Sequence, residues 1–579
     1  MRWLVLLGAL APLACSGGGD CPETPQCSPD GYQLFTCQDD EPVTIDCLRS
    51  AGQLCEAGAC VDPWRYGSPS FGSCPNAAHA TAESLAEKAT HYDALGSRLH
   101  VHPELGWSLG VTLKGKEIAC APGATPPCVD PLEPAVAEAQ ATWADVETWH
   151  SGENDGLWSA LYLTSQAYRF GATRSEEALS NIRRLLDAEV KRMRITGVPG
   201  VFTRQLIPPG VPGISCPTRD EVYTTDPEKN DNKWVQVRED GCVWVVDRAT
   251  LAWTKSDHCG LQEFAGYCWL DNVSKDEYSG HMLALAAIYR LVDVPDIRAT
   301  AADLLTQVGD HILRNDMKIV DWDGRRTEHG QFSPVAFDDF PGFNAVIAMA
   351  YVRAAAEASG RADIQRLYDE CFLQKAGPKL CAGLDEPTAF PEFFESSGMY
   401  VGAEGCGSNY NNISMHLLSL HTLLWFEREA AVREKVQASF DLDVMRTPGQ
   451  PRAIIGQHNA LFDFMWAAGK RLGPGSDGPA FDAVEDGICM LRQFRASQAE
   501  VDITLDPVRH QPYCKGRFGN DVSQHPRESW ERCAATFVWW GDPYSLGTCT
   551  ANRRQINPPS GYLLPYWMGR YYGFIGPEL

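Results

Sequence analysis

From Cys74 to the C-terminus, the chain is dominated by segments whose apolar residues recur at the spacing of an amphipathic helix. About a dozen such segments follow one another, at 83–99, 134–149, 156–170, 175–195, 276–291, 296–314, 344–358, 364–372, 413–427, 432–440, 458–469 and 480–492. Strand patterns are short and sparse, and no linker separates the segments into several domains. The pattern predicts one mainly α unit over 74–579, an α/α toroid of paired helices. A helical solenoid is the alternative, although no repeat of fixed period is present.

The cysteines predict an oxidised protein with a small cross-linked module at its N-terminal end. Setting Cys15 aside leaves 20 of the 21 cysteines, an even number. Six of them crowd into a module at 21–62, namely Cys21, Cys27, Cys37, Cys47, Cys55 and Cys60. None of their spacings is the C-x-x-C of a zinc site, and the module has few core residues, so we expect three disulfides. Other cysteines fall in local groups within the long loops, including the Trp- and Tyr-rich stretch 196–275, which is too long for a passive connector.

The first residues have the character of an export signal. Arg2 precedes a short apolar run that ends at Cys15, and Gly and Ser follow. This resembles the lipobox of bacterial lipoproteins, although Pro12 stands where Leu is usual. We expect a leader at 1–14, a lipid on Cys15 and a tether at 15–20, which would hold the protein at the cell envelope. An ordinary secretory signal is the alternative.

The charge of the chain excludes one class of partner. The formal net charge is −25, so no basic surplus exists to displace the counterions of a nucleic acid. An acidic glycan would need a local basic site. No later stretch is apolar and long enough for a transmembrane helix.

Three polar clusters are candidate sites. The first holds Asp271, Asp276, Glu277, Tyr278 and His281, where Glu277 and His281 are four residues apart and share one helix face. For Asp276, a role as a helix cap explains the sequence as well as a functional role does. In the second cluster, Asp155 precedes the apolar run that contains Trp158. Asp155 is either a helix cap or a functional carboxylate, and in the second case Trp158 would be the aromatic platform on which a sugar stacks.

The third cluster, at 321–330, contains Glu328 and a D-x-D-G sequence. A tight turn at Asp323–Gly324 explains it better than a calcium loop, because Phe332 stands where an EF-hand requires Glu. We expect no metal or other cofactor, although the acidic loops would tolerate calcium.

Four segments resemble uncharacterised bacterial exported proteins thought to have the six-hairpin glycosidase fold: NDGLW at 154–158, TGVPG at 196–200, WLDNVSKDEYSGH at 269–281 and LPYWMGRY at 564–571. The resemblance implies an α/α toroid and action on carbohydrate. On this basis the substrate-binding candidates are Trp158, Tyr278, Trp269 and Arg570.

The main hypothesis is an inverting glycoside hydrolase acting on a polysaccharide. Such an enzyme needs a protonated carboxyl and a carboxylate that activates water. We expect Glu277 to be the acid and Asp155 the base, with Asp276 or Glu328 as substitutes and His281 as proton partner.

Two alternatives stay open. A uronate lyase would use Tyr278, His281, Asn272 and Arg570, with positive charge from the Arg325–Arg326 or Arg553–Arg554 pairs. In a non-catalytic glycan-binding or structural surface protein, every cluster would reduce to caps and packing.

Overall fold

The computed structural model describes residues 21–28, 33–39, 41–47, 54–61, 74, 79–150, 152–219, 232–247, 249–334, 341–381, 383–396, 405–407, 409–444, 457, 459–470, 479–534, 541–577 and 579. The chain divides into two compact units, 1–63 and 64–579. The expected leader, the Cys15 lipid site and the tether fall outside the described residues.

The small unit is built from short strands and disulfides. Its strands are β1 (Gln26–Cys27), β2 (Gln33–Gln38) and β3 (Glu41–Asp46) in one antiparallel sheet, and β4 (Leu54–Glu56) and β5 (Ala59–Val61) in a hairpin. The disulfides are Cys21–Cys37, Cys27–Cys55 and Cys47–Cys60. The buried apolar residues that pack together in this unit are Leu34, Cys47 and Cys55. So small a core leaves the cross-links to hold the unit together, as the sequence predicts.

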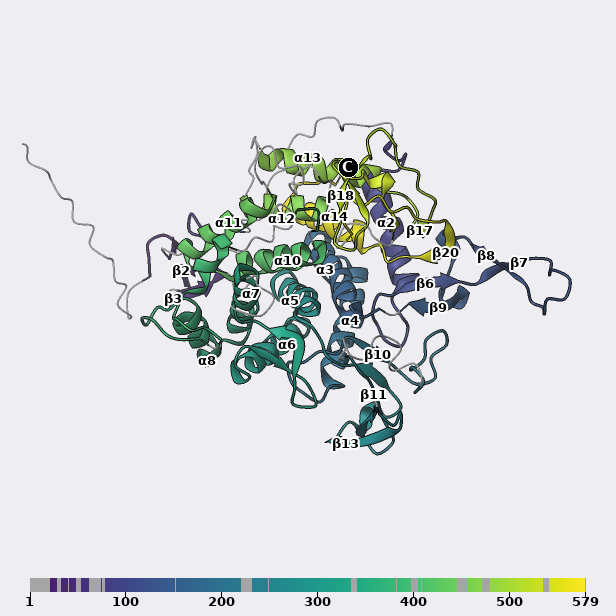
Figure 1. Ribbon diagram of the computed structural model, residues 1–579. Helices are drawn as coiled ribbons and strands as arrows, with labels where there is room; N and C mark the ends of the chain where they lie inside the picture. Colours follow the sequence, from purple (N-terminus) through teal and green to yellow (C-terminus); the bar gives the residue numbers. More distant parts are fainter. Residues whose placement is uncertain are drawn as a thin grey trace, which may run out of the picture. The chain divides into compact units, whose positions relative to one another are not determined.

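Six helices of the large unit contact one another in a closed circuit (Figure 1). In order around it they are α3 (Asp155–Thr173), α5 (Lys275–Leu291), α7 (Pro341–Ser359), α10 (Tyr410–Phe426), α12 (Ala460–Lys470) and α14 (Ser560–Tyr572), which returns to α3. These helices are buried on nearly all sides; in α5 every residue except Asp276 is buried. Such all-round burial marks them as the core of the unit.

Six further helices pack against the members of this circuit. They are α2 (Leu85–Leu95) on α14, α4 (Glu176–Arg194) on α3, α6 (Pro295–Arg314) on α5 and α7, α8 (Ala362–Arg366) on α7, α11 (Ala430–Val444) on α10 and α12, and α13 (Pro479–Gln493) on α12. In α4 and α6, buried apolar residues alternate with exposed charged ones at helical spacing. Eleven of these twelve helices coincide with segments that the helical spacing predicts, so the prediction of these helices is confirmed.

The strands are more numerous than the sequence analysis predicted. The segment 134–149, expected to be a helix, holds two 3-10 turns and most of strand β9 (Val146–His150). Strand β9 joins β6 (Gly110–Leu113), β20 (Asn552–Ile556) and β17 (Ala499–Glu500) in a four-stranded sheet. The stretch 196–275 contains five strands: β10 (Gln205–Ile207), β11 (Trp234–Val237), β12 (Cys242–Val246), β13 (Trp253–Cys259) and β14 (Cys268–Leu270). These segments form strands because they pair with distant strands. A search for helical periodicity does not detect such pairing.

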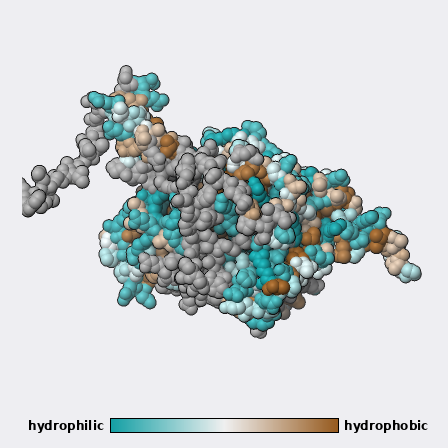
Figure 2. Space-filling model, turned by 90° about the horizontal axis from the view of Figure 1, so that it is seen from above, coloured by the Kyte–Doolittle hydropathy of each residue, from teal (hydrophilic) through white to brown (hydrophobic). Residues whose placement is uncertain are grey.

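Three two-stranded sheets complete the described strands. They are β7 (Gly115–Glu117) with β8 (Val129–Pro134), which forms a projecting arm in Figure 1, β15 (Lys318–Val320) with β16 (Arg326–Gln331), and β18 (Pro512–Lys515) with β19 (Asp521–Ser523). In the view from above, hydrophilic residues cover most of the described surface and hydrophobic ones form small separate patches (Figure 2).

Seven disulfides cross-link the large unit. They are Cys74–Cys489, Cys120–Cys128, Cys216–Cys268, Cys242–Cys259, Cys371–Cys381, Cys406–Cys514 and Cys533–Cys549. With the three of the small unit, they pair 20 of the 21 cysteines. Ten disulfides in one chain indicate an oxidising, extracytoplasmic environment. Among the described helices, none combines the length and apolar character needed to cross a membrane.

A buried pair of acids between α12 and α13 makes the stability of the large unit depend on pH. Burial, together with the facing carboxylate of Asp486, raises the pKa of Asp463 well above its ordinary value, while Arg532 opposes the shift. A carboxyl with a raised pKa contributes its stability at low pH and loses it as the pH rises through the folded-state pKa.

We therefore expect Asp463→Asn to stabilise the protein near neutral pH, because the neutral amide avoids the cost of a buried carboxylate that faces another acid. The gain should shrink toward pH 4, where the wild-type carboxyl is protonated. Urea unfolding across this pH range measures it. A difference that stayed constant with pH, or grew in acid, would show that the acid pair is not its cause.

Candidate functional site

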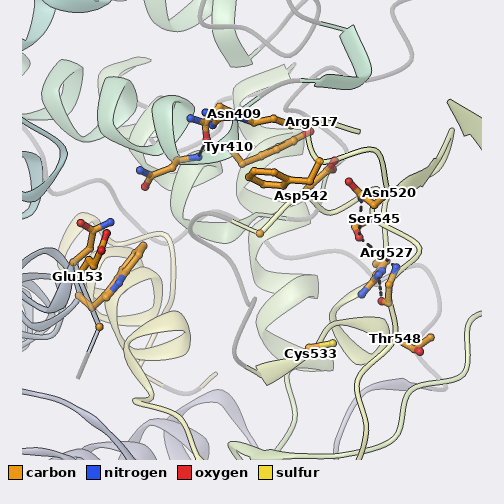
Figure 3. A pocket seen from close by; sticks show the side chains of 17 residues that line it. Glu153, Asn409, Tyr410, Arg517, Asn520, Arg527, Cys533, Asp542, Ser545 and Thr548 are labelled. Carbon is orange, nitrogen blue, oxygen red and sulfur yellow. Dashed lines mark hydrogen bonds between the residues drawn. The ribbon is translucent and has the colours of Figure 1, made fainter. Parts of the chain in front are cut away.

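A cavity of about 950 Å³ lies where the first turns of α3 and α10 meet a long segment near the C-terminus. Its lining comes from three stretches of chain: Gly152, Glu153, Asn154 and Trp158; Asn409, Tyr410 and Asn411; and Arg517, Phe518, Asn520, Arg527, Cys533, Gly541, Asp542, Ser545, Gly547 and Thr548. Figure 3 shows Glu153 on one side of this cavity and Asp542, Arg517 and Tyr410 across from it. The cavity is therefore built from residues more than 350 positions apart in sequence.

Asparagines start both helices at the cavity. Asn154 precedes α3, and Asn409 precedes α10, where its side chain accepts a hydrogen bond from the Asn411 amide at 3.2 Å. Asparagine is favoured at this position because its side chain satisfies an otherwise unpaired N–H group. The same residues give the cavity amide donors and place the positive end of the α10 dipole beside it.

Two disulfides fix the opposite wall. Cys406, in the short turn before α10, is bonded to Cys514 in β18, and Cys533 is bonded to Cys549. The turn between β18 and β19 carries Arg517, Phe518 and Asn520 to the cavity. The wall is thus tied covalently to the start of α10.

Aromatic side chains line the cavity on both sides. Trp158 is half-buried, Tyr410 is buried, and Phe518 is 88% exposed. An exposed phenyl ring at the edge of a cavity is costly in water and gains by covering an apolar surface. Such faces suit the C–H surface of a pyranose ring.

A smaller cavity of about 250 Å³ adjoins the first and shares Gly152 and Trp158 with it. Asp155 lines it with only 6% of its surface exposed, and its Oδ1 accepts a hydrogen bond from the Gly152 amide at 2.7 Å. His150 lines the same cavity, where burial lowers its pKa. Of the acids that the sequence singles out, Asp155 is the one placed directly on a cavity wall.

Asp276 is the second acid near this site. It stands in the first turn of α5, is the single residue of that helix that is not buried, and its Oδ2 accepts a hydrogen bond from the Asn411 side chain at 3.3 Å. Because Asn411 lines the large cavity, Asp276 lies directly behind its wall. Helix α5 packs between α3 and α10, so all three begin near one another.

Glu277 and His281, expected on the bowl surface, instead form a fully buried ionic network. His281 Nδ1 is 2.5 Å from Glu189 and its Nε2 is 3.6 Å from Glu277. Burial raises the pKa of Glu277. Burial by itself would lower the pKa of His281, but the Glu189 and Glu277 carboxylates together raise it above its ordinary value. Arg192 and Gly156 pack against the same two side chains. A methyl group at Gly156 would collide with Arg192, Glu277 and His281. The structure buries both side chains, and neither cavity includes them.

The remaining predicted contacts also lie away from both cavities. Trp269 is buried, and the Tyr278 hydroxyl donates to the Gly200 carbonyl at 2.6 Å. Glu328 is partly exposed on β16, where its amide donates to the Asn272 side chain. Arg570 packs on α14 and donates to Tyr566. These side chains hold the fold together, and neither cavity includes them.

The lyase set is dispersed for the same reason. Tyr278 and His281 are buried, Asn272 is held by Asn232 and Glu328, and Arg570 lies on a different helix. The candidate arginine pairs are occupied as well: Arg325 with Asp323, Arg326 with Gln331, Arg553 with Glu133 and Arg554 with Glu147. Tyr278 and His281 lie side by side, with ring centres 6.4 Å apart, but neither cavity includes any of the four residues of this set.

Two groups of residues could be suspected of binding a metal, and the structure shows a turn at one and a disulfide at the other. Asp323–Gly324 forms the expected turn, with the Gly324 amide donating to the Asp321 carbonyl. Within the described residues, the group of side chains spaced for a metal is Glu500 with Cys533 and Cys549, but these two cysteines are bonded to each other. A disulfide offers no thiolate, so this group is not a metal site.

Most of the cavity lining escaped the sequence analysis. The polar cluster at 153–155 and Trp158 were found, but Tyr410 and Asp542 stand in no recognised motif, and the turn with Arg517 and Phe518 has the sequence of an ordinary hairpin tip. Cys514, Cys533 and Cys549 form a local group of three, so one of them must pair with a cysteine elsewhere in the chain. That odd number was the signal that this region lies against a distant segment.

No known protein family matches this chain, and no curated protein is significantly similar to it in sequence. Its structure is similar to a metagenome-derived glycoside hydrolase family 9 endoglucanase (TM-score 0.30, 11% identity, covering 85% of this chain and 80% of that one). It is also similar to an unsaturated glucuronyl hydrolase variant from Streptococcus agalactiae (TM-score 0.32, 9% identity, covering 88% of this chain and 98% of that one). A third similar structure is the cellulase Cel9M of C. cellulolyticum (TM-score 0.33, 10% identity, covering 74% of this chain and 88% of that one). Assignment of a function rests on the cavity and its side chains.

Proposed function

We propose that the large unit is an α/α toroid of the six-hairpin glycosidase type and that the protein hydrolyses a polysaccharide. The closed circuit of six helices, each with an outer partner, supports the fold. The observation that carries the function is the large cavity, with aromatic faces at Trp158, Tyr410 and Phe518 and acidic groups within and behind its walls. Aromatic faces bind sugar rings, and carboxylates bind or activate their hydroxyls and water.

In this proposal Asp155 and Asp276 are the paired carboxylates. They start the neighbouring helices α3 and α5, which pack closely together. The Gly152 amide holds the Asp155 carboxyl in place on the cavity wall, where it would act as the base, while Asp276 takes the role first given to Glu277. Trp158, three residues after Asp155, shares its helix face and would stack on the sugar. An inverting reaction requires the carboxyls to stand ~6.5–9.5 Å apart, with water between them.

The proposal includes the location. An export leader at 1–14 followed by a lipid on Cys15 would anchor the chain at the envelope through the 15–20 tether, with the module at 21–62 as a spacer. The disulfide pairing supports this, because Cys15 is the single cysteine left outside the ten disulfides.

Glycan binding without catalysis is the second candidate function. The exposed Phe518 ring and the width of the cavity favour it, since both serve binding whether or not a bond is cleaved. The two functions share the cavity and differ in the need for Asp155 and Asp276.

We expect the purified full chain to release oligosaccharides from one member of a polysaccharide panel, with products that carry an added water by mass spectrometry. Asp155→Asn and Asp276→Asn should each reduce the rate by about 10²- to 10⁴-fold, because each removes a proton-transfer group. Retention on a polysaccharide without release would support the binding protein instead. Unsaturated products would contradict hydrolysis.

A further inference from the structure

The large cavity has a basic side, although the chain has a net charge of −25. Arg517 reaches it from the turn between β18 and β19, and Arg527 lines it from the segment after β19. Figure 3 shows Arg517 beside Asn409 and Arg527 below Ser545. The amides of Asn411 and Asn520 add neutral donors to the same lining. Cationic and amide N–H groups together are the usual partners of carboxylate and sulfate oxygens.

Arg527 is a built feature of this wall. It is only 4% exposed, its Nη2 donates to the Gly547 carbonyl and its backbone amide donates to the Pro543 carbonyl at 2.8 Å. Its buried Nε has no hydrogen-bond partner among the described residues. A guanidinium stays charged at every physiological pH, and a buried donor without a partner costs free energy. Because Arg527 lines the cavity, an anion there would lie beside a fixed positive charge.

Acidic groups stand near Arg527 as well, since Asp542 and Glu153 line the same cavity. Asp542 and Glu531 both stabilise the cationic form of Arg527 electrostatically, against the lowering of its pKa by burial. The Asp542 Oδ1 accepts a hydrogen bond from the Tyr544 amide at 2.8 Å, which orients this carboxylate and leaves its charge in place. Arg517 lies on the exposed hairpin tip, with its guanidinium 5.5 Å from the ring centre of Phe518. An anionic sugar whose ring covers Phe518 would therefore meet Arg517 at its substituent.

We propose that this cavity binds an acidic glycan, whose ring carboxylate or sulfate is held by Arg517 and Arg527. This inference rests on the proposed function of the cavity in binding glycans, and it names the substrate class. The start of α10 favours the same charge, because helix N-termini attract anions.

Binding to the full chain with the Asp155→Asn substitution tests this without turnover. The probes are a galacturonate tetrasaccharide, a chondroitin sulfate tetrasaccharide and neutral cellotetraose, titrated by calorimetry at low and high salt. We expect an acidic probe to bind at least about tenfold more tightly than the neutral one, with an affinity that falls as salt rises. The galacturonate probe carries carboxylates alone, whereas the chondroitin sulfate probe carries carboxylates and sulfates. Weaker binding after desulfation of the chondroitin probe would identify sulfate as the bound anion, and unchanged binding would identify carboxylate.

Arg517→Ala should lower the affinity for the acidic probe by about tenfold and leave the affinity for cellotetraose unchanged. The matched control is Arg553→Ala, which removes an equal charge from an exposed arginine, 63% accessible, outside the cavity lining. Arg527→Lys keeps the charge but loses the planar guanidinium with its paired N–H donors, and should also lower the affinity for the acidic probe. Equal effects of Arg517→Ala and Arg553→Ala would overturn the proposal.

Two further outcomes separate this proposal from the proposed function. If neutral and acidic probes bind equally, the acidic substrate class is wrong while glycan binding stands. If neither probe class binds, both fail. If the acidic probe binds as expected but the wild-type chain never cleaves the polymer it comes from, the inference stands and hydrolysis of that polymer is excluded.

Discussion

Replacing Glu277 by alanine is expected to lower the free energy of unfolding by about 4 kcal/mol, the usual cost of breaking a buried charge network. The side chain is fully buried, accepts a hydrogen bond from the Leu157 amide at 3.0 Å and lies beside His281. Its removal leaves the buried guanidinium of Arg192, stacked at 3.3 Å on the Trp107 ring, without one of its counter-charges. Urea unfolding at neutral pH measures the loss.

The neighbouring residue provides the contrast. Asp276→Asn should change stability little, because Asp276 is the single residue of α5 that is not buried. Its expected effect is on the reaction. Glu277→Ala should leave the rate per folded molecule unchanged, as measured under conditions where the variant is folded. If the two variants exchanged these behaviours, with Glu277→Ala stable and inactive, Glu277 would be the acid after all.

Replacing Gly280 by alanine is expected to lower the free energy of unfolding by about 3 kcal/mol, the upper end of the usual cost of overpacking. An added Cβ would lie 2.8 Å from the Leu157 Cα and 2.8 Å from its carbonyl oxygen. These are backbone atoms of α3, so the two helices must separate to make room. The gain of about 1 kcal/mol in helix propensity from Gly to Ala offsets only part of this. Thermal unfolding followed by circular dichroism measures the loss.

Gly407→Ala serves as the control, because a Cβ at that position meets nothing within 4 Å. It should leave the melting temperature within a degree or two of wild type, since surface substitutions cost little. A similar loss in both variants would mean that the close crossing of α3 and α5 is not the cause.

Helical periodicity was enough to predict most of the fold. Segments such as 175–195 and 296–314 carry a clear apolar stripe, and both form helices within a residue of the expected limits. The strands were missed because their partners are remote: β6 pairs with β20 across more than 400 residues. Neither strand has a local pattern that indicates the other.

For the site, the sequence located two of the right helix starts but not the direction of the side chains. Asp276 and Glu277 are adjacent in sequence, yet a step of one residue turns about 100° around a helix, so one faces the cavity side and the other the core. The wall that carries Arg517 and Phe518 depends on the Cys406–Cys514 bond, and disulfide partners cannot be read from spacing.

The circuit of helices is closed by its two ends. Helix α14, the last of the described helices of the large unit, packs on α2 and α3, the first two of them, while β6 and β9 share a sheet with β17 and β20. The Cys74–Cys489 bond joins the same two ends. A partly synthesised chain therefore has a ring with a gap and an unpaired sheet edge, and its core is sealed only when the final helix arrives. Long-range closure of this kind is slow to form, and it suits a polypeptide that crosses a membrane unfolded and matures afterwards, where oxidation can lock the finished ring.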